Sequence, residues 1–277
     1  MRIVVKVGTS TLAHATGRMN IRHVEDLVKV LSDLKNAGHE VILVSSGAIG
    51  MGVGKLNLPG KPSDMPSKQA AAAVGQCELM YTYDRLFLQY NHTVAQILLT
   101  GEDVDHAERR QNFENTLERL LELGALPIIN ENDSVATAEL KHIENFGDND
   151  TLSAIVAALI DADLLILLSD IDGLYTDDPR QNPDAEFIEQ VDELTDEFMN
   201  MGKASTGSNV GTGGMNTKMI AAKIATSSDV DMIIANSRDI GVLHRLLEGE
   251  NEGTLFVAHR EESFDLPEFV QNLHKNQ

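Results

Sequence analysis

The chain alternates between short continuous apolar runs and longer segments in which apolar residues recur every three or four positions. Continuous runs predict strands buried on both faces of a sheet, and the spaced pattern predicts helices with one apolar face. Strands that alternate with helices indicate a mostly parallel sheet covered on both sides. We expect strands at 3–7, 41–44, 93–99, 126–129, 164–168, 232–235 and 254–258, and helices at 21–36, 67–90, 109–123, 151–160, 217–226 and 242–248.

Two further segments, 50–68 and 202–214, are rich in glycine with proline, serine or threonine, and we predict both as loops. The end of the chain, 264–277, predicts one short helix with a proline in its first turn and apolar residues on one face. No interdomain linker is visible. We therefore expect one domain over 1–260 and a tail over 261–277 that is too short to be a domain.

The 277 residues include 43 acidic and 22 basic side chains, which gives a formal net charge of −21. That field repels nucleic acid and anionic membrane surfaces, so we expect neither as a partner. No apolar run approaches the ~18 residues of a membrane helix. The first residues enter a strand directly and do not resemble a signal peptide, and the single Cys77 cannot form an internal disulfide. These features favour a reducing, cytoplasmic location.

Polar residues follow the predicted strands at the ends where ligands of parallel sheets bind. Lys6 lies within the first apolar run, where an unpaired ammonium group is costly, and small residues at 8–10 come directly after it. Such residues let backbone N–H groups approach an anion. Ser46 follows the second strand, and the polar cluster 130–134 follows the fourth. Each feature also has a plain structural explanation, because lysine can extend to water and small polar residues are common in turns.

A glycine-rich loop at 211–214 leads into the helix that carries Lys218. The N–H groups of such a loop and the N-terminus of a helix favour phosphate. A cation is not favoured in that first turn, so we expect Lys218 to have an anionic partner. The chain contains no P-loop, and the turn after the first strand lacks the Rossmann glycines. The nine histidines show no paired metal-ligand spacing.

Eight stretches occur in the order found in the amino acid kinase family, and together they span residues 1–257. The chain resembles that family, which implies a three-layer αβα sandwich around a mainly parallel sheet. The combination of INENDSVAT, GDND and GTGGMNTK is most similar to the branch that transfers phosphate from ATP to the γ-carboxylate of L-glutamate, the first step of proline biosynthesis. The stretches are VVKVGTS, VILVSSGAI, SKQAAAAVGQ, INENDSVAT, GDNDTLSA, SDIDGLYTDDPR, GTGGMNTK and GTLF.

The resemblance implies that the N-terminal part binds glutamate and the C-terminal part binds ATP. Lys6 and Lys218 match the two lysines that stabilise the transferred phosphoryl group, and Asp150 matches the carboxylate that positions them. Mg²⁺ accompanies ATP and rides on its phosphates, so we expect no metal site made of protein groups alone. The residues that match the glutamate site are Ser46, Asp133 and Asn149, and those that match the ATP site are Lys6, Ser169, Asp170, Thr212, Gly213, Gly214, Met215, Asn216, Thr217 and Lys218.

The resemblance also implies a homo-oligomer, a dimer or tetramer, and feedback inhibition by proline. The alanine-rich segment 67–79 is apolar over much of its surface, so we expect it to be buried in a subunit interface. Many members of the family carry a second, C-terminal PUA domain. We expect none here, because only the tail 261–277 follows the kinase motifs.

Three other functions compete with this interpretation. A kinase of the same family could act on N-acetylglutamate, aspartate, carbamate or uridylate, and the INENDSVAT and GDND stretches argue against these substrates. A catalytically inactive sensor of a nucleotide or amino acid would lack a lysine at position 6 or 218, and both are present. A dehydrogenase would need the missing Rossmann fingerprint.

Overall fold

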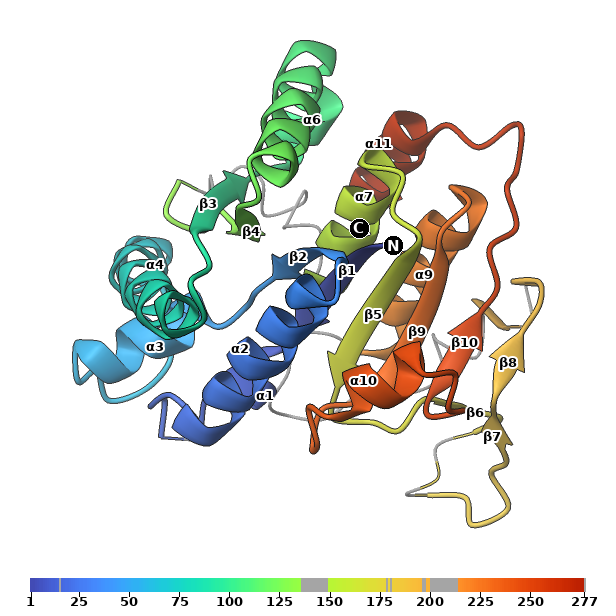
Figure 1. The fold of residues 1–277 in the computed structure, drawn as a ribbon, viewed down its shortest axis with the longest axis horizontal. Helices are drawn as coiled ribbons and strands as arrows, with labels where there is room; N and C mark the ends of the chain where they lie inside the picture. Colours follow the sequence, from blue (N-terminus) through green and yellow to red (C-terminus); the bar gives the residue numbers. More distant parts are fainter. Residues whose placement is uncertain are drawn as a thin grey trace.

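The computed structural model of the chain describes residues 1–14, 16–135, 149–177, 179, 181–195, 198–199 and 214–276. Its centre is one large sheet, shown in Figure 1. In the described chain this sheet has eight strands, and two more strands, β6 (Leu174–Tyr175) and β7 (Phe187–Ile188), form a separate antiparallel pair. The eight are β1 (Arg2–Val7), β2 (Glu40–Val44), β3 (Val94–Leu99), β4 (Leu126–Glu131), β5 (Leu164–Ser169), β8 (Gln190–Val191), β9 (Asp231–Asn236) and β10 (Thr254–Phe256).

The sheet is mostly parallel, as the alternation of strands and helices predicts. Its order is β3-β4-β2-β1-β5-β9-β10-β8, and every neighbouring pair from β3 to β9 is parallel. The pair β9–β10 is antiparallel, and β10 is parallel to β8. The inner strands are continuous runs of Val, Ile and Leu because both of their faces are covered.

Helices cover both faces of the sheet, so the fold has three layers (Figure 1). The face that carries Val4 and Leu165 packs against one group of helices, and the face that carries Val5 packs against another. This arrangement confirms the αβα sandwich. The first group is α5 (Gly101–Asp105), α6 (Ala107–Glu122), α7 (Asn149–Leu159), α9 (Met215–Ser227) and α11 (Leu266–Asn276), and the second is α1 (Thr9–Leu12), α2 (Ile21–Asn36), α3 (Ala48–Lys55), α4 (Met65–Phe87) and α10 (Val242–Leu247).

Helix α2 shows how the apolar spacing sets one such contact. The Asn20 side chain accepts a hydrogen bond from the backbone N–H of His23 and caps the first turn. Val24, Leu27 and Leu31 recur on one face of the helix and are buried against the sheet. The helix stops where Gly38 takes a φ of 95°, a conformation that favours glycine.

The prediction of a loop over 50–68 is wrong at both ends, because α3 runs to Lys55 and α4 begins at Met65. The reason lies in how α3 meets α4. A Cβ on Gly52 would lie 1.8 Å from the carbonyl oxygen of Ala71, and one on Gly75 would lie 1.7 Å from that of Ala48. The glycines that suggested a loop are the residues that let two helix backbones touch. Residues 56–64 connect the two helices.

Several short elements were not predicted at all. Helix α5 has five residues and begins with a capping box between Thr100 and Asp103. Strands β6, β7 and β8 have two residues each. Elements this short contain less than two periods of any hydrophobic pattern, so the pattern cannot show them.

The C-terminal tail forms α11, as predicted, and packs on the face of the sheet covered by α7 and α9. Val270 is buried, and Phe269 and Leu273 lie against the same core. The tail therefore extends the core of the domain. None of the helices in the described ranges is both long enough and apolar enough to cross a membrane.

Candidate active site

The carboxyl ends of five parallel strands, β4, β2, β1, β5 and β9, meet at one edge of the sheet. Their register is close, because Lys6 lies opposite Val44 of β2 and Leu167 of β5. Ser169 at the end of β5 lies opposite Asn236 of β9. The polar residues that follow these strands are therefore neighbours, as expected for a ligand site in a parallel sheet.

Two lysines and one aspartate form a buried triad at this edge. Side chains along β1 alternate between the two faces of the sheet. Lys6 therefore shares a face with Val4, the face that α7 and α9 cover. Its Nζ is 2.6 Å from Oδ1 of Asp150, the second residue of α7, and Nζ of Lys218 on α9 is 3.0 Å from Oδ2. The three side chains are 1–6% exposed. Thr217 Oγ1 lies 3.3 Å from the same Oδ2 atom.

The triad holds more positive than negative charge. Burial opposes ionisation of Asp150, yet the charges of Lys6 and Lys218 outweigh it and hold the pKa of this carboxyl well below its usual range. One carboxylate between two ammonium groups leaves one formal positive charge away from water, which favours binding of an anion. The expectation that Lys218 has an anionic partner is confirmed, and that partner is Asp150.

A second buried network surrounds Asn149, the residue before Asp150. Its Nδ2, which carries two hydrogens, lies within hydrogen-bond distance of three acceptors: the backbone oxygen of Ser45 at 2.7 Å, Oγ of Ser46 at 2.9 Å and Oδ1 of Asn130 at 3.0 Å. Nδ2 of Asn130 in turn donates to Oε1 of Gln76 on α4, at 2.9 Å. Two of the glutamate-matched residues, Ser46 and Asn149, are thus in direct contact.

Two groups of buried polar residues meet at the N-terminus of α7. Asn149 contacts the residues that follow β2 and Asn130 near the end of β4, and the adjacent Asp150 contacts Lys6 of β1 and Lys218 of α9. An aspartate in the first turn also interacts favourably with the helix dipole. A single helix start therefore fixes the distance between the amide network and the lysine triad.

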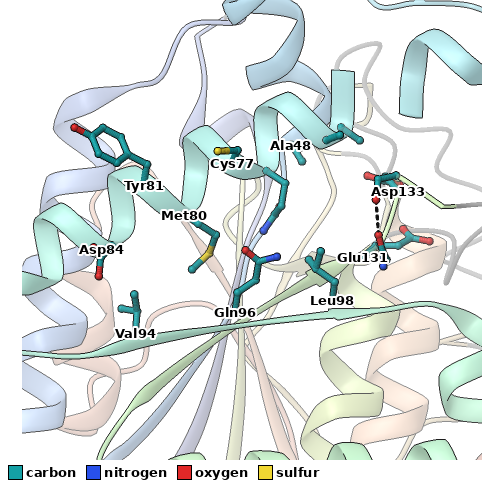
Figure 2. Close-up of a pocket in the computed structure, with 15 residues that line it drawn as sticks. Ala48, Cys77, Met80, Tyr81, Asp84, Val94, Gln96, Leu98, Glu131 and Asp133 are labelled. Atoms are coloured by element: carbon teal, nitrogen blue, oxygen red, sulfur yellow. Dashed lines mark hydrogen bonds between the residues drawn. The ribbon is translucent and has the colours of Figure 1, made fainter. Parts of the chain in front are cut away.

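A cavity of about 650 Å³ lies between α4 and the edge strand β3, and it reaches the turn after β4. Figure 2 shows Cys77 and Met80 of α4 on one side of it and Gln96 of β3 on the other. Asp133, the third residue that matches a glutamate site, lines the cavity beside Glu131. Burial raises the pKa of the Asp133 carboxyl, although the charge of Lys61 opposes the shift. The lysine triad is not part of this cavity wall.

Apart from Lys6, the nucleotide-matched residues that the structure describes lie at the carboxyl end of β5 and at the start of α9. Ser169 is buried, Asp170 is exposed, and Ser169 Oγ donates to an Asp170 carboxylate oxygen at 3.3 Å. Gly214 caps α9. Met215, Asn216 and Thr217 form the first turn of α9 before Lys218, whereas Thr212 and Gly213 lie outside the described residues.

The residues described hold no group of three or more His, Cys, Asp or Glu side chains placed to bind a metal ion. Asp150 is the carboxylate at the centre of the site, and both of its oxygens face lysine ammonium groups. These residues do not fit a metal ion held by the protein. They fit an anionic ligand that brings its own cation.

Sequence reasoning missed two members of the site. Asn130 belongs to the polar cluster 130–134 and lies near the end of β4, but nothing marked it as the buried partner of Asn149. Gln76 lies within an alanine-rich helix, where a glutamine is usually exposed. The signal for Asn130 was its place directly at a strand end. Gln76 carried no such signal, because its contact with Asn130 spans 54 positions of the chain.

Several known proteins are similar to this chain over nearly its whole length. Glutamate 5-kinase of Clostridium perfringens is 52% identical over 261 residues, which cover 94% of this chain and 97% of that protein. Glutamate 5-kinase of Listeria innocua is 49% identical and 94% of each chain is covered. Glutamate 5-kinase of Carboxydothermus hydrogenoformans is 51% identical, and the match covers 69% of that protein.

Solved structures share the fold at low identity. UMP kinase from Bacillus anthracis has a TM-score of 0.61 at 17% identity and covers 93% of this chain and 96% of its own. Isopentenyl phosphate kinase from T. acidophilum has a TM-score of 0.60 at 17% identity, and the match covers 92% of this chain and 100% of that one. A sequence profile described as the amino acid kinase family matches residues 1–236. Since that match spans most of the chain, the protein belongs to the amino acid kinase family.

Proposed function

We propose that this protein transfers the γ-phosphoryl group of ATP to the γ-carboxylate of L-glutamate, giving γ-glutamyl phosphate and ADP, the first step of proline biosynthesis. The observation that carries the proposal is the buried triad of Lys6, Asp150 and Lys218, whose net positive charge suits a transferring phosphoryl group. The substrate rests on the relatives with about half of their residues identical, which are glutamate 5-kinases by name. A cytoplasmic location fits a reaction that consumes ATP.

In the proposed reaction, a γ-carboxylate oxygen of glutamate attacks the γ-phosphorus of ATP. A new P–O bond forms, the bond to the β,γ-bridging oxygen breaks, and its electron pair leaves with ADP. The attacking carboxylate is already ionised at neutral pH, so no general base is needed. Catalysis then consists of alignment and charge stabilisation, which Lys6 and Lys218 supply while Asp150 holds them in place.

The two substrates divide the domain between them. Glutamate binds at the N-terminal part, where Ser46 and Asn149 contact each other and Asp133 lines the adjacent cavity. The Asp133 carboxylate suits the substrate ammonium group. ATP binds at the C-terminal part, at the end of β5 and at the start of α9 together with the residues that precede it in the sequence. The proposed ATP contacts are Lys6, Ser169, Asp170, Thr212, Gly213, Gly214, Met215, Asn216, Thr217 and Lys218.

Mg²⁺, when bound with ATP, neutralises part of the phosphate charge. We propose that it is carried by the nucleotide, since the described carboxylates are not grouped around a metal position. The loops around the reacting groups must exclude water, because an acyl phosphate hydrolyses readily.

The test of this function is an ATP-dependent assay with hydroxylamine, which converts an acyl phosphate into a hydroxamate. Glutamate, N-acetylglutamate, aspartate, carbamate and uridylate are compared at equal concentration. We expect hydroxamate to form from glutamate. ADP formation is measured as well, because phosphorylated uridylate gives no hydroxamate. If another acceptor causes faster ADP formation than glutamate does, the substrate is wrong. If no acceptor, glutamate included, causes ATP to be consumed, the protein is a sensor.

Replacing Asp133 by alanine should raise the KM for glutamate by roughly 10²-fold, since this half-buried carboxylate is the proposed partner of the substrate ammonium group. The KM for ATP should stay near its wild-type value. N-acetylglutamate should be a poor substrate for the same reason, because acetylation removes the positive charge. Steady-state kinetics with each substrate varied in turn measures these effects.

Asp84→Ala is the matched control, because Asp84 lines the same cavity but is exposed. The raised pKa of Asp133 adds a pH test. Below that pKa the carboxyl is neutral, so the wild-type KM for glutamate should rise as the pH falls toward it, and the Asp133→Ala variant should lack this rise. An Asp133→Ala variant that affects only the KM for ATP would contradict the assignment.

Proline should inhibit by competing with glutamate. It carries the same α-carboxylate and a ring ammonium group, which suit the groups proposed to bind glutamate at Ser46, Asp133 and Asn149. The measurement is the rate at subsaturating glutamate with and without saturating proline. An unchanged rate would show that this enzyme is not regulated in this way.

The protein should form a dimer or larger homo-oligomer through α4. Ala70, Ala73, Cys77 and Tyr81 form an exposed stripe along that helix, and the adjacent β3 is an edge strand of the sheet. Exposed apolar helix faces and strand edges are normally covered by a partner. Light scattering should give at least twice the monomer mass, and Ala70→Arg should lower it. A monomeric wild-type protein at assay concentration would refute the interface.

A further inference from the structure

The amide network around Asn149 ends on α4 at Gln76. Oε1 of Gln76 accepts a hydrogen bond from Nδ2 of Asn130, which is 1% exposed. Oδ1 of Asn130 accepts from Nδ2 of Asn149 at 3.0 Å and from the backbone N–H of Glu131 at 2.9 Å. Three elements far apart in the sequence, α4, β4 and α7, are thus linked by three side-chain amides.

The backbone groups in this network fix which way each amide faces. The N–H of Glu131 can only donate, so the oxygen of Asn130 must face it and the nitrogen of Asn130 must face Gln76. The carbonyl of Ser45 can only accept, so the nitrogen of Asn149 must face Ser45. A contact between Asn149 and a substrate ammonium group would therefore involve Oδ1 of Asn149.

Gln76 is one of two groups that hold Asn130 in this orientation, and the N–H of Glu131 is the other. Without an acceptor at Gln76, the buried Nδ2 atom of Asn130 would lose this partner, which costs free energy. A full rotation of the amide would not recover it, because the nitrogen would then face two donors, the N–H of Glu131 and Nδ2 of Asn149. A smaller displacement of Asn130 toward another acceptor would weaken its contact with Asn149, one of the three contacts of Asn149 Nδ2.

The backbone at Gln76 is itself held firmly. The preceding residue, Gly75, is packed so closely on α3 that a Cβ there would lie 1.7 Å from the carbonyl oxygen of Ala48. Helix α3 begins just after Ser46, a residue that also contacts Asn149. The helix pair α3–α4 therefore supports the Asn149 amide from two sides.

We propose that Gln76 is a positioning residue for the amino-acid site, acting through Asn130 on the side chain of Asn149. The proposal rests on the proposed function in one respect, that Asn149 binds glutamate. Gln76 also lines the cavity beside α4, so direct contact with the substrate is the competing explanation. A role only in the stability of α4 is a second competing explanation.

A double-mutant cycle separates these three roles. Gln76→Leu should raise the KM for glutamate roughly 10-fold, the factor that corresponds to loss of one hydrogen bond, while the KM for ATP stays near wild type. In an Asn149→Ala background the same change should raise that KM less than about 2-fold, because the residue on which Gln76 acts is gone. Gln111→Leu, an exposed glutamine on α6, is the matched control and should change neither value.

Equal effects of Gln76→Leu in both backgrounds would show direct contact with substrate and overturn the proposal. So would a loss of thermal stability with no change in the KM for glutamate, which is the result expected of a purely structural residue. A wild-type KM for glutamate in Gln76→Leu would overturn it as well.

A spectroscopic measurement tests the link without any substrate. The ¹⁵N side-chain amide signal of Asn149, identified by its loss in Asn149→Ala, should shift in Gln76→Leu and not in Gln111→Leu. If that shift is seen but wild-type protein makes no hydroxamate from glutamate, the proposed function fails and the positioning role stands. If wild-type protein is active and the signal does not shift, the positioning role fails alone.

Discussion

Replacing Lys6 or Lys218 by methionine should lower kcat by roughly 10²–10³-fold, the cost of removing one preorganised donor from a charged transition state. Both ammonium groups are buried at the same carboxylate, 2.6 Å and 3.0 Å away, so neither can substitute for the other by moving. Methionine keeps the length and apolar stem of the side chain. Asp150 keeps one lysine partner in each variant, so the fold should be retained. The hydroxamate assay at saturating glutamate and ATP measures kcat.

Lys223→Met serves as the control for this pair. Lys223 lies on the same helix as Lys218, but it pairs with Glu261 and its side chain is about a quarter exposed. Its replacement should leave kcat near the wild-type value. A Lys6→Met or Lys218→Met variant with near-normal kcat would remove that lysine from the mechanism.

Replacing Asp150 by asparagine should affect both stability and catalysis. Removal of the shared carboxylate leaves two buried ammonium groups without an opposite charge, which costs about 3–5 kcal/mol of folding free energy. That cost corresponds to a fall in Tm of roughly 10 °C for a domain of this size. The lysines should also leave their positions, so kcat should fall roughly 10²-fold or more. Calorimetry and the hydroxamate assay measure the two effects.

The pH dependence follows from the lowered pKa of Asp150. Because the folded-state pKa lies below the unfolded value, the stabilisation by the triad is present above the ordinary carboxyl pKa of about 4. It is lost as the pH falls through the lowered value. Wild-type protein should therefore lose this stabilisation only in acid, and Asp150→Asn should lack that part of the acid transition.

Asp161→Asn is the matched control for Asp150→Asn. Asp161 is exposed just beyond the other end of α7, where its φ of 46° suits asparagine, so its change should leave Tm and kcat nearly unchanged. Added phosphate should raise the Tm of Asp150→Asn more than that of wild type, because an anion then meets two uncompensated charges. Equal Tm values for Asp150→Asn and wild type would contradict the conclusion that the Asp150 carboxylate compensates the charges of two buried ammonium groups.

The sequence by itself determined the alternating strands and helices and the edge of the sheet at which the site lies. The seven predicted strands and the apolar spacing in helices such as α2 predicted a parallel sheet covered on both faces, because period and burial are local properties of the chain. The same pattern placed Lys6 with Val4 on one face of β1. The motifs around Asp150 and Lys218 pointed to a shared anion site by resemblance to a family. Local composition failed at α3, where glycines that suggested a loop serve close helix packing.

Only the tertiary structure decided which of these polar residues touch. Asn149 and Asp150 are neighbours in sequence, yet they have different partners. Asn149 contacts the ends of β2 and β4, and Asp150 contacts two lysines that are 212 positions apart. The position of the start of α7 on the sheet causes this division. Gln76 ends the stretch SKQAAAAVGQ, yet nothing in that stretch indicates its hydrogen bond to Asn130, which exists only once α4 lies against the sheet. Hydrogen bonds and ion pairs act over about 3 Å, and a sequence pattern records no such distances between remote residues.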